Sequence, residues 1–242
     1  VGVDPLDQDV LQQASQLKVI SKYGVGTDNI DLETARENNI IVTVTEDANT
    51  NAVAEYTVTL MLAVMRRIIE IDQKCRQSDW RKLTSFEMSG KTLGIIGLGN
   101  IGKRVIQLLC GYDLNLLAYD IDRDEAFAAK HNVSYVTFDT LLKESDFISL
   151  HAPLNERTHH MISHDQFAMM KENAIIVNTA RGGLIDEQAL LTVLKDNRIW
   201  GAGLDVFEEE PPQEKAFFNL SNLVIGSHCA ASTYEAINNM SY

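Results

Sequence analysis

Apolar residues along the chain fall into short runs, separated by segments in which apolar positions recur every three to four residues. Short apolar runs bounded by turns predict buried strands, and the longer recurrence predicts amphipathic helices. After Lys91 the alternation is continuous, with elements expected at 92–96, 101–110, 114–119, 139–144, 146–150, 174–178, 186–195, 201–206 and 222–226. Apolar strands alternating with helices predict an α/β fold, a doubly wound parallel sheet with helices on both faces.

A shorter alternation of the same kind occupies the first 50 residues. Helices are expected over Asp7–Gln16 and Leu32–Asn38, the second entered through Asp31, and strands over Lys18–Ser21 and Ile40–Thr43. This part therefore predicts a second, smaller α/β domain.

A single long helix is expected from Ala52 to Cys75, capped by one of residues 49–51. Its apolar residues go nearly all the way round, a pattern typical of a helix buried on both sides. We expect it to lie between two domains or in the interface of a homodimer. A domain boundary near residue 80 would give a substrate domain over 1–80 and a dinucleotide domain over 81–242.

A glycine-rich turn follows the first strand of the larger domain, with the sequence Gly97-Leu98-Gly99-Asn100-Ile101-Gly102. Gly97 permits the tight turn, the missing Cβ of Gly99 lets the backbone approach a pyrophosphate, and Gly102 lets the helix pack on the strand. The N-terminus of that helix, from Asn100 and Ile101, then holds the phosphates. Asp120 ends the second strand, where a carboxylate can accept hydrogen bonds from the adenosine ribose.

The same features predict the cofactor. A glycine-rich turn that binds nothing is the alternative, but strand, helix and acid are all in place. We therefore expect a Rossmann-type domain that binds NAD. NADP should bind less well, because Asp120 would repel its 2′-phosphate.

Three further polar residues follow later strands of the same sheet: Arg181, Glu210 and His228. Ligands of open α/β sheets bind at the carboxyl ends of strands, so these residues can converge on the nicotinamide end of the cofactor. Arg can bind a carboxylate with two parallel hydrogen bonds, His can exchange a proton with a hydroxyl or carbonyl, and a carboxylate can orient the His. Singly, each is more often a surface charge or a structural residue. Together, downstream of the glycine-rich turn, they favour a catalytic site.

With these motifs the chain resembles the D-isomer-specific 2-hydroxyacid dehydrogenases, most closely the D-3-phosphoglycerate dehydrogenases of that family. The likeness rests on motifs in order along the chain, namely Lys22–Asp31, Ala54-Glu55, Gly90–Gly94, His151–Leu154, Asn178–Gly183 and Gly201–Phe207. It implies hydride transfer between NAD and a small D-2-hydroxy acid. D-3-phosphoglycerate leads, and reduction of glyoxylate or hydroxypyruvate is the alternative.

The resemblance also implies roles for single residues. Arg181 binds the substrate carboxylate and carbonyl, His228 is the acid/base, and Glu210, directly before Pro211, is its partner. Asp205 lies near the nicotinamide carboxamide. The other residues that the family's motifs imply at the cofactor are His151, Pro153, Thr179 and Ala180.

For the substrate, the resemblance implies binding through backbone N–H groups of Val25 and Gly26. Lys22 either meets a substrate phosphate or is an ordinary surface lysine. Gly226-Ser227 stand where the family commonly has Thr-Pro or Cys-Pro, which predicts a looser loop before His228. The family's opening elements are not found in this chain, so the smaller, flavodoxin-like substrate domain is expected to be incomplete.

A different class of protein also resembles this family, the C-terminal-binding transcriptional corepressors, which sense a dinucleotide and keep the Arg, Glu and His. A peptide-binding groove in the first domain would favour that interpretation over an enzyme.

Charge and composition narrow the partners. The net charge of −13 argues against nucleic acid and against an anionic membrane surface. No apolar run reaches the roughly 20 residues that span a bilayer. The three cysteines have no C-x-x-C spacing, which favours reduced thiols in a cytoplasmic protein. His160 and His164 are four residues apart, but no carboxylate completes a set, so we expect a solvated pair and no metal.

Overall fold

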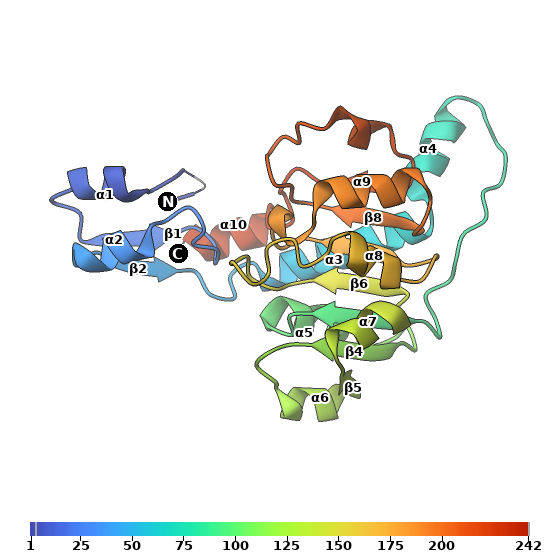
Figure 1. Ribbon diagram of the computed structural model, residues 1–242, viewed down its shortest axis with the longest axis horizontal. Coiled ribbons are helices and arrows are strands. Elements are labelled where there is room, and N and C mark those ends of the chain that lie inside the picture. Colours follow the sequence, from blue (N-terminus) through green and yellow to red (C-terminus); the bar gives the residue numbers. More distant parts are fainter. Residues whose placement is uncertain (3, 242) are drawn as a thin grey trace. The chain divides into compact units, whose positions relative to one another are not determined.

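The computed structural model describes residues 1–2 and 4–241 (Figure 1). The chain divides into two compact units, of which unit 1 comprises Val1–Ala52 and Ala231–Tyr242, and unit 2 comprises Val53–Ala230. The elements are α1 (Gln8–Gln13), β1 (Val19–Lys22), α2 (Leu32–Glu37), β2 (Ile41–Val44), α3 (Thr50–Met65), α4 (Ile68–Arg76), β3 (Thr92–Ile96), α5 (Asn100–Leu108), β4 (Asn115–Tyr119), α6 (Glu125–His131), β5 (Val133–Tyr135), α7 (Phe138–Glu144), β6 (Phe147–Leu150), α8 (His164–Met169), β7 (Ile175–Asn178), η1 (Gly182–Leu184), α9 (Glu187–Lys195), β8 (Gly201–Leu204), η2 (Lys215–Asn219), β9 (Leu223–Ile225) and α10 (Tyr234–Ser241).

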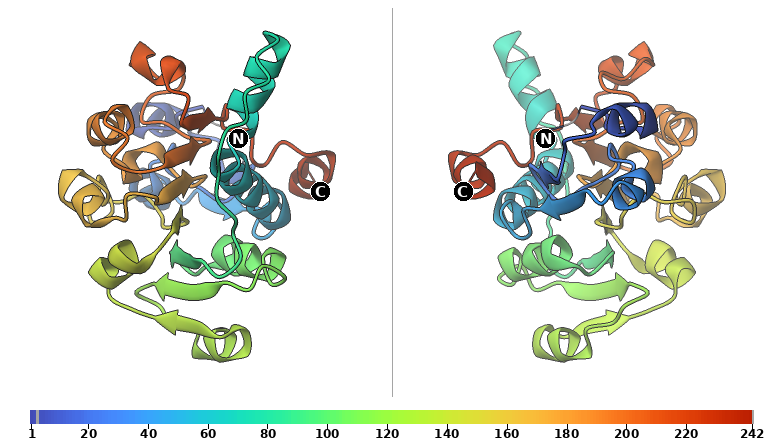
Figure 2. Two further views of the ribbon diagram at one scale, coloured as in Figure 1. Left: turned by 90° about the vertical axis from the view of Figure 1, so that its right-hand side faces the viewer. Right: turned by 90° about the vertical axis from the view of Figure 1, so that its left-hand side faces the viewer.

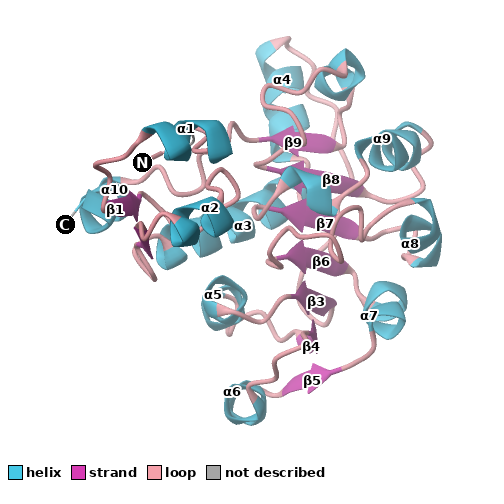
Figure 3. Cartoon of the chain, turned by 60° about the vertical axis from the view of Figure 1, so that its left-hand side comes forward, coloured by secondary structure: helices cyan, strands magenta, loops and turns pink. Residues whose placement is uncertain are grey.

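Unit 2 is built on a seven-stranded sheet in which every strand pair is parallel, in the order β5-β4-β3-β6-β7-β8-β9. Figure 3 shows α5 and α6 on one face of the sheet and α7, α8 and α9 on the other. The chain order reverses between β3 and β6, so this edge is the topological switch point at which such sheets bind ligands. The doubly wound α/β fold expected from the sequence is confirmed.

The burial of the strands explains why their sequences read as continuous apolar runs. All four residues of β6, β7 and β8 are buried, since helices cover both faces. One core cluster joins the sheet to α7, α8 and α9, and a second joins it to α3 and α5. The polar residues that the sheet carries are therefore concentrated in the loops at the strand ends.

Unit 1 is a smaller α/β arrangement. Strands β1 and β2 pair in parallel, and Leu11, Ile20, Ile30, Ala35 and Ile40 form its core. The side chain of Asp31 caps α2 by accepting a 2.9 Å hydrogen bond from the backbone N–H of Thr34, as the sequence predicts. Helix α10 belongs to this unit and packs through Ala236 and Met240.

The prediction of a single long helix from Ala52 to Cys75 is wrong, because the helix is interrupted between α3 and α4 (Figure 2). Arg67 adopts a left-handed conformation, with φ 55°, which ends the helical hydrogen bonding. Its guanidinium is held 2.7 Å from Glu70 and lies 5.8 Å from the centroid of the Trp200 ring. These contacts stabilise the interruption of the helix. No glycine or proline at this point of the sequence indicates it.

The position of helix α3 also bears on where the domain boundary falls along the chain. The sequence places a domain boundary near residue 80, whereas the compact units divide after Ala52. Leu60, Met61 and Val64 of α3 pack in the same core as Leu93 and Ile95 of β3. Over the described residues, no helix is both long and apolar enough to cross a membrane.

Candidate active site

The glycine-rich turn joins β3 to α5 at the switch point of the sheet. Gly97 has φ +91°, and a Cβ there would lie 2.7 Å from the backbone carbon of His151. A Cβ on Gly102 would lie 2.6 Å from the carbonyl oxygen of Gly97, whereas the space beside Gly99 is open. Two of these glycines thus allow close packing, and the third leaves room for a ligand next to the backbone.

The N-terminus of α5 is suited to an anion. Its cap is Gly99, no side chain caps it, and its first turn carries no acidic residue. The first N–H groups of a helix have no intrahelical acceptors, and the helix dipole favours negative charge there. Asn100 and Ile101 are the first residues of this turn, so the helix start fits a pyrophosphate.

Asp120 follows β4 and faces the same turn. Its Oδ2 accepts a 2.5 Å hydrogen bond from the N–H of Leu98, and its Oδ1 accepts one of 2.9 Å from Asp122. The carboxylate is therefore fixed beside the glycine-rich turn, where a ribose would lie. Arg123, three residues further along the chain, has its guanidinium 5.1 Å from the centroid of the Tyr135 ring.

The turn after β7 carries Thr179, Ala180 and Arg181, and a buried asparagine holds it together. The Asn178 side chain donates to the carbonyl of Arg181 at 2.8 Å and accepts from the N–H of Ala180 at 3.0 Å. Thr179 is hydrogen-bonded at 2.8 Å to the buried Thr57 of α3. Arg181 is partly buried, with its Nη1 donating to the carbonyl of Ala180 at 2.6 Å.

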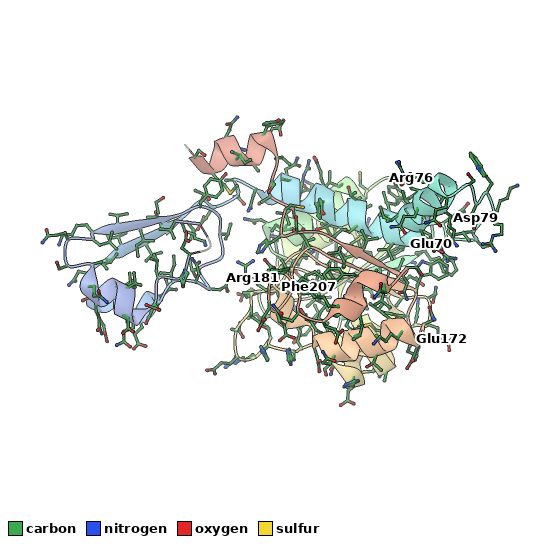
Figure 4. The ribbon with its side chains drawn as sticks, turned by 90° about the horizontal axis from the view of Figure 1, so that it is seen from above. Glu70, Arg76, Asp79, Glu172, Arg181 and Phe207 are labelled. Atoms are coloured by element: carbon green, nitrogen blue, oxygen red, sulfur yellow. The ribbon has the colours of Figure 1, made fainter. Side chains whose placement is uncertain are left out.

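The loops after β7 and β8 touch each other. A Cβ on Gly182 would lie 1.9 Å from the backbone carbon of Phe207, so only glycine fits. Figure 4 shows Arg181 and Phe207 close to one another. The segment that carries Arg181 is thus packed on the segment that leads to Glu210.

Asp205, at the end of β8, is 1% exposed and anchors the loop after β9. Its carboxylate accepts hydrogen bonds from the N–H groups of Cys229, at 3.0 Å, and Ala230, at 2.8 Å, and its carbonyl accepts from His228 at 2.7 Å. Its own N–H donates to the carbonyl of Asn178 at 2.9 Å. The loop that Gly226-Ser227 would leave loose therefore has three hydrogen bonds to one buried residue.

His228 and Glu210 form a pair. The Nδ1 atom of His228 lies 2.8 Å from Oε2 of Glu210, and the two side chains are 44% and 39% exposed. The other carboxylate oxygen of Glu210 accepts from the N–H of Phe207 at 3.2 Å. With Nδ1 held by the carboxylate, Nε2 is the nitrogen available for proton exchange with a ligand.

The backbone of His228 is itself unusual, because its φ is +56°. A non-glycine residue in the left-handed region carries a conformational cost, and such residues cluster at functional sites. The hydrogen bonds that the N–H groups of His228, Cys229 and Ala230 donate to Asp205 hold it there. This conformation, together with the pair, makes the end of β9 a candidate site for proton transfer.

His151 and Pro153 follow β6, next to the glycine-rich turn. The Nε2 atom of His151 lies 2.9 Å from the hydroxyl of Ser149. Burial of the ring lowers the pKa of His151 to about 4. The ring therefore stays neutral near pH 7, which agrees with a packing or cofactor contact. Pro153 is exposed.

The candidate substrate residues lie in unit 1. Lys22 is only 7% exposed, and its ammonium donates to the carbonyl of Gly2 and, at 2.7 Å, to Oδ1 of Asn29. Val25 is exposed and Gly26 half-buried, in a loop that Thr45 holds through its hydroxyl, which accepts from the N–H of Gly24 at 2.9 Å. Two residues of the loop are thus accessible, whereas the lysine has internal partners.

Sequence reasoning missed two residues that shape the site. Asn178 belongs to one of the sequence motifs. Its role in holding the turn after β7 follows only from the structure, in which it is 1% exposed. Tyr56 of α3 contacts the loop after β9, with its hydroxyl 3.4 Å from Sγ of Cys229. Burial raises the pKa of Tyr56, so it remains a neutral phenol. No local pattern links this helix to that loop.

Comparison with known proteins agrees with this geometry. Residues 58–230 match the family model described as the D-isomer specific 2-hydroxyacid dehydrogenase, NAD binding domain. A glyoxylate reductase of Thermococcus litoralis is 43% identical over 242 residues, covering 96% of this chain and 73% of the relative. A D-3-phosphoglycerate dehydrogenase of Methanocaldococcus jannaschii is 45% identical over 232 residues, covering 95% of this chain and 44% of the relative.

A solved structure shares the fold over nearly the whole chain. The D-lactate dehydrogenase from Aquifex aeolicus, complexed with NAD and lactic acid, superposes with a TM-score of 0.93 at 32% identity. The match covers 99% of this chain and 78% of the other. The fold described above is therefore shared with a solved oxidoreductase structure.

Proposed function

The chain belongs to the D-isomer-specific 2-hydroxyacid dehydrogenases, which are NAD-dependent enzymes, and from this premise we propose that it reduces a short 2-oxo acid. Glyoxylate and hydroxypyruvate are the substrates we favour. The observation that carries the proposal is the His228–Glu210 pair, 2.8 Å apart at the carboxyl end of the NAD-binding sheet. A pair of this kind can give a proton to a carbonyl oxygen and take it back from a hydroxyl.

The residues at the switch point fit NAD. Open space beside Gly99, the uncapped start of α5 and the fixed carboxylate of Asp120 suit a pyrophosphate followed by a ribose with two free hydroxyls. When bound, NAD supplies the hydride acceptor or, when reduced, the hydride donor. Asp120 favours NAD over NADP, because its charge would face a 2′-phosphate.

In the proposed reduction, the protonated ring of His228 donates the proton on Nε2 to the carbonyl oxygen of the substrate. Glu210 keeps the ring oriented through Nδ1 and stabilises its positive charge. Arg181 binds the substrate carboxylate and stabilises charge that develops on the carbonyl oxygen. In the reverse direction, neutral His228 accepts the hydroxyl proton.

The burial of Lys22 bears on the substrate. A phosphorylated substrate needs an accessible cation, and the ammonium of Lys22 is already bound by Gly2 and Asn29. This favours a structural role for Lys22 and an unphosphorylated substrate, and a relative 43% identical is named a glyoxylate reductase. D-3-phosphoglycerate remains the second candidate, because a relative 45% identical carries that dehydrogenase name.

The test is oxidation of NADH by purified protein with glyoxylate, hydroxypyruvate, pyruvate and 3-phosphohydroxypyruvate. We expect the highest kcat/KM with one of the first two, and a His228→Gln variant serves as the control for turnover at this site. Highest activity with the phosphorylated acid would favour the second candidate. Tight NADH binding without turnover of any of the four acids would favour a dinucleotide-sensing interaction protein instead.

We also propose that two copies of the chain associate through the region of α3 and α4. Helix α3 is apolar on several faces, and its core contacts cover only some of them. Ile68 and Ile69 of α4 are 52% and 46% exposed, and Trp80 is 80% exposed. Sedimentation at micromolar concentration should give a dimer, and a Trp80→Ala variant should shift it towards monomer. A monomeric parent protein would contradict this.

A further inference from the structure

Three potential metal ligands from two separate loops meet on unit 2, outside the catalytic pair. We propose that His159, His160 and Glu208 form a binding site for a divalent transition-metal ion of the zinc type. One ligand atom from each residue lies within 4.8 Å of the other two. Nε2 of His160 lies 3.0 Å from Oε1 of Glu208, and the two imidazole rings are stacked with centroids 3.9 Å apart.

The chemistry of these ligands selects the ion. Two imidazole nitrogens and one carboxylate oxygen are a set that zinc accepts, with water filling the remaining position. Imidazole suits zinc, copper and nickel, whereas magnesium and calcium prefer sites made of oxygen alone. The proposed ion is therefore a transition metal, held at an accessible surface site.

The backbone on the histidine side of the site is fixed. His160 has φ +50°, so the chain turns sharply there and brings its ring over the neighbouring loop. Its N–H donates to the carbonyl of Gly183 at 2.8 Å, and Ile162 donates to the carbonyl of Leu184 at 3.1 Å. The pair of histidines is thus anchored to η1.

The glutamate side is anchored as well. The N–H of Glu208 donates to Oε1 of Glu187 at 2.6 Å, and Phe207 packs tightly on Gly182. Oε1 of Glu208 also lies 3.4 Å from the N–H of Glu187, a contact that can orient the carboxylate. A metal ligand oriented in this way loses less freedom when the ion binds.

The surrounding charge favours a cation. Glu209 follows Glu208 directly in the chain, and the carboxylate of Glu187 accepts the hydrogen bond from the N–H of Glu208, so three carboxylates lie in the same neighbourhood. A divalent ion would relieve this repulsion among neighbouring carboxylates. The expected pair of His160 with His164 is replaced by a pair with a glutamate 48 residues further on.

The experiment is calorimetric titration of Zn²⁺ into the full chain after chelator treatment. We expect one ion per chain, bound at least tenfold more weakly by His159→Gln, His160→Gln and Glu208→Gln, since losing even an outer-shell partner costs roughly that much. His164→Gln and Glu209→Gln are the matched controls, and they should bind as the parent does. Unchanged affinity in the three ligand variants would overturn the proposal.

A second measurement distinguishes zinc bound at this site from zinc bound by other groups of the chain. Cobalt replaces zinc in such sites, and a site without thiolate should show no sulfur charge-transfer band. Zn²⁺ should also raise the thermal unfolding temperature of the parent and of Cys229→Ser, but not of the His159→Gln/His160→Gln double variant. NADH affinity equal to the parent's verifies that this variant is folded. Loss of the shift in Cys229→Ser, or its persistence in the double variant, would refute the site.

Discussion

Replacing Gly226 by alanine should separate catalysis from cofactor binding. A Cβ at this position would lie 2.2 Å from Oδ1 of Asp205 and 2.7 Å from the hydroxyl oxygen of Tyr56. The same Oδ1 accepts the hydrogen bond from the N–H of Cys229, next to His228. The added methyl group must therefore displace the carboxylate that holds the catalytic loop, or the loop itself.

The size of the effect follows from these distances. An ordinary contact to a Cβ begins at 3.4 Å, so the neighbouring groups must move by roughly 1 Å. Misplacement by about 1 Å can cost on the order of 10²-fold in rate, and we expect kcat for 2-oxo acid reduction to fall by about that factor. Overpacking should also lower the free energy of unfolding by about 1–3 kcal/mol. NADH affinity should change much less, because the residues that we propose bind the adenosine and the pyrophosphate lie at the ends of β3 and β4.

The assay compares kcat and KM for the 2-oxo acid, NADH affinity by fluorescence titration, and urea unfolding. Gly111→Ala is the matched control, because a Cβ there meets no atom within 4 Å and its backbone is not left-handed. Parent-like turnover in Gly226→Ala would refute the reasoning. So would a loss of NADH affinity as large as the loss of kcat, since the damage would then extend beyond the loop of His228.

Three further predictions concern the site. His228→Gln should lower kcat by roughly 10²–10⁴-fold while NADH affinity stays close to the parent value. Glu210→Gln should lower kcat by a smaller factor. A loss of NADH affinity as large as the loss of kcat would contradict the proton-transfer role. Asp120→Ala should improve NADP affinity relative to NAD, measured by titration with both cofactors, and an unchanged ratio would exclude Asp120 as the selector. Since burial lowers the pKa of His151 to about 4 from 6.5, the unfolded state binds more protons between these values. The free energy of unfolding should therefore fall as pH drops from about 6.5 towards 4, and His151→Gln should weaken that dependence in urea titrations.

The glycine-rich turn could be predicted from the sequence because its requirements are local. Gly97 has the positive φ of the turn, Gly102 packs against the carbonyl oxygen of Gly97 in the same strand–turn–helix unit, and Asp120 follows the next strand directly. The alternation of apolar strands and helices likewise predicts the parallel sheet. Both signals lie within stretches of about 30 residues, where spacing and residue type carry enough information.

Features that depend on contacts between residues far apart in the sequence could not be predicted from local spacing and residue type. The break at Arg67 depends on Trp200, and the anchoring of His228 depends on Asp205, more than 20 residues earlier. The family resemblance implies Asp205 as a cofactor contact, and its hydrogen bonds to the loop after β9 become visible only when β8 and β9 are paired. Helix α6 and strand β5 are short, so their periodicity is too brief to detect.

The left-handed backbone of His228 has a consequence for how such a chain can change. A sequence altered only towards greater stability would drift to glycine or asparagine at this position, since both accept that conformation more readily than histidine does. Histidine at this position therefore carries a conformational cost, and the buried carboxylate of Asp205 offsets that cost. Stabilising designs that treat His228 as an ordinary loop residue would select against the group to which we assign the proton transfer.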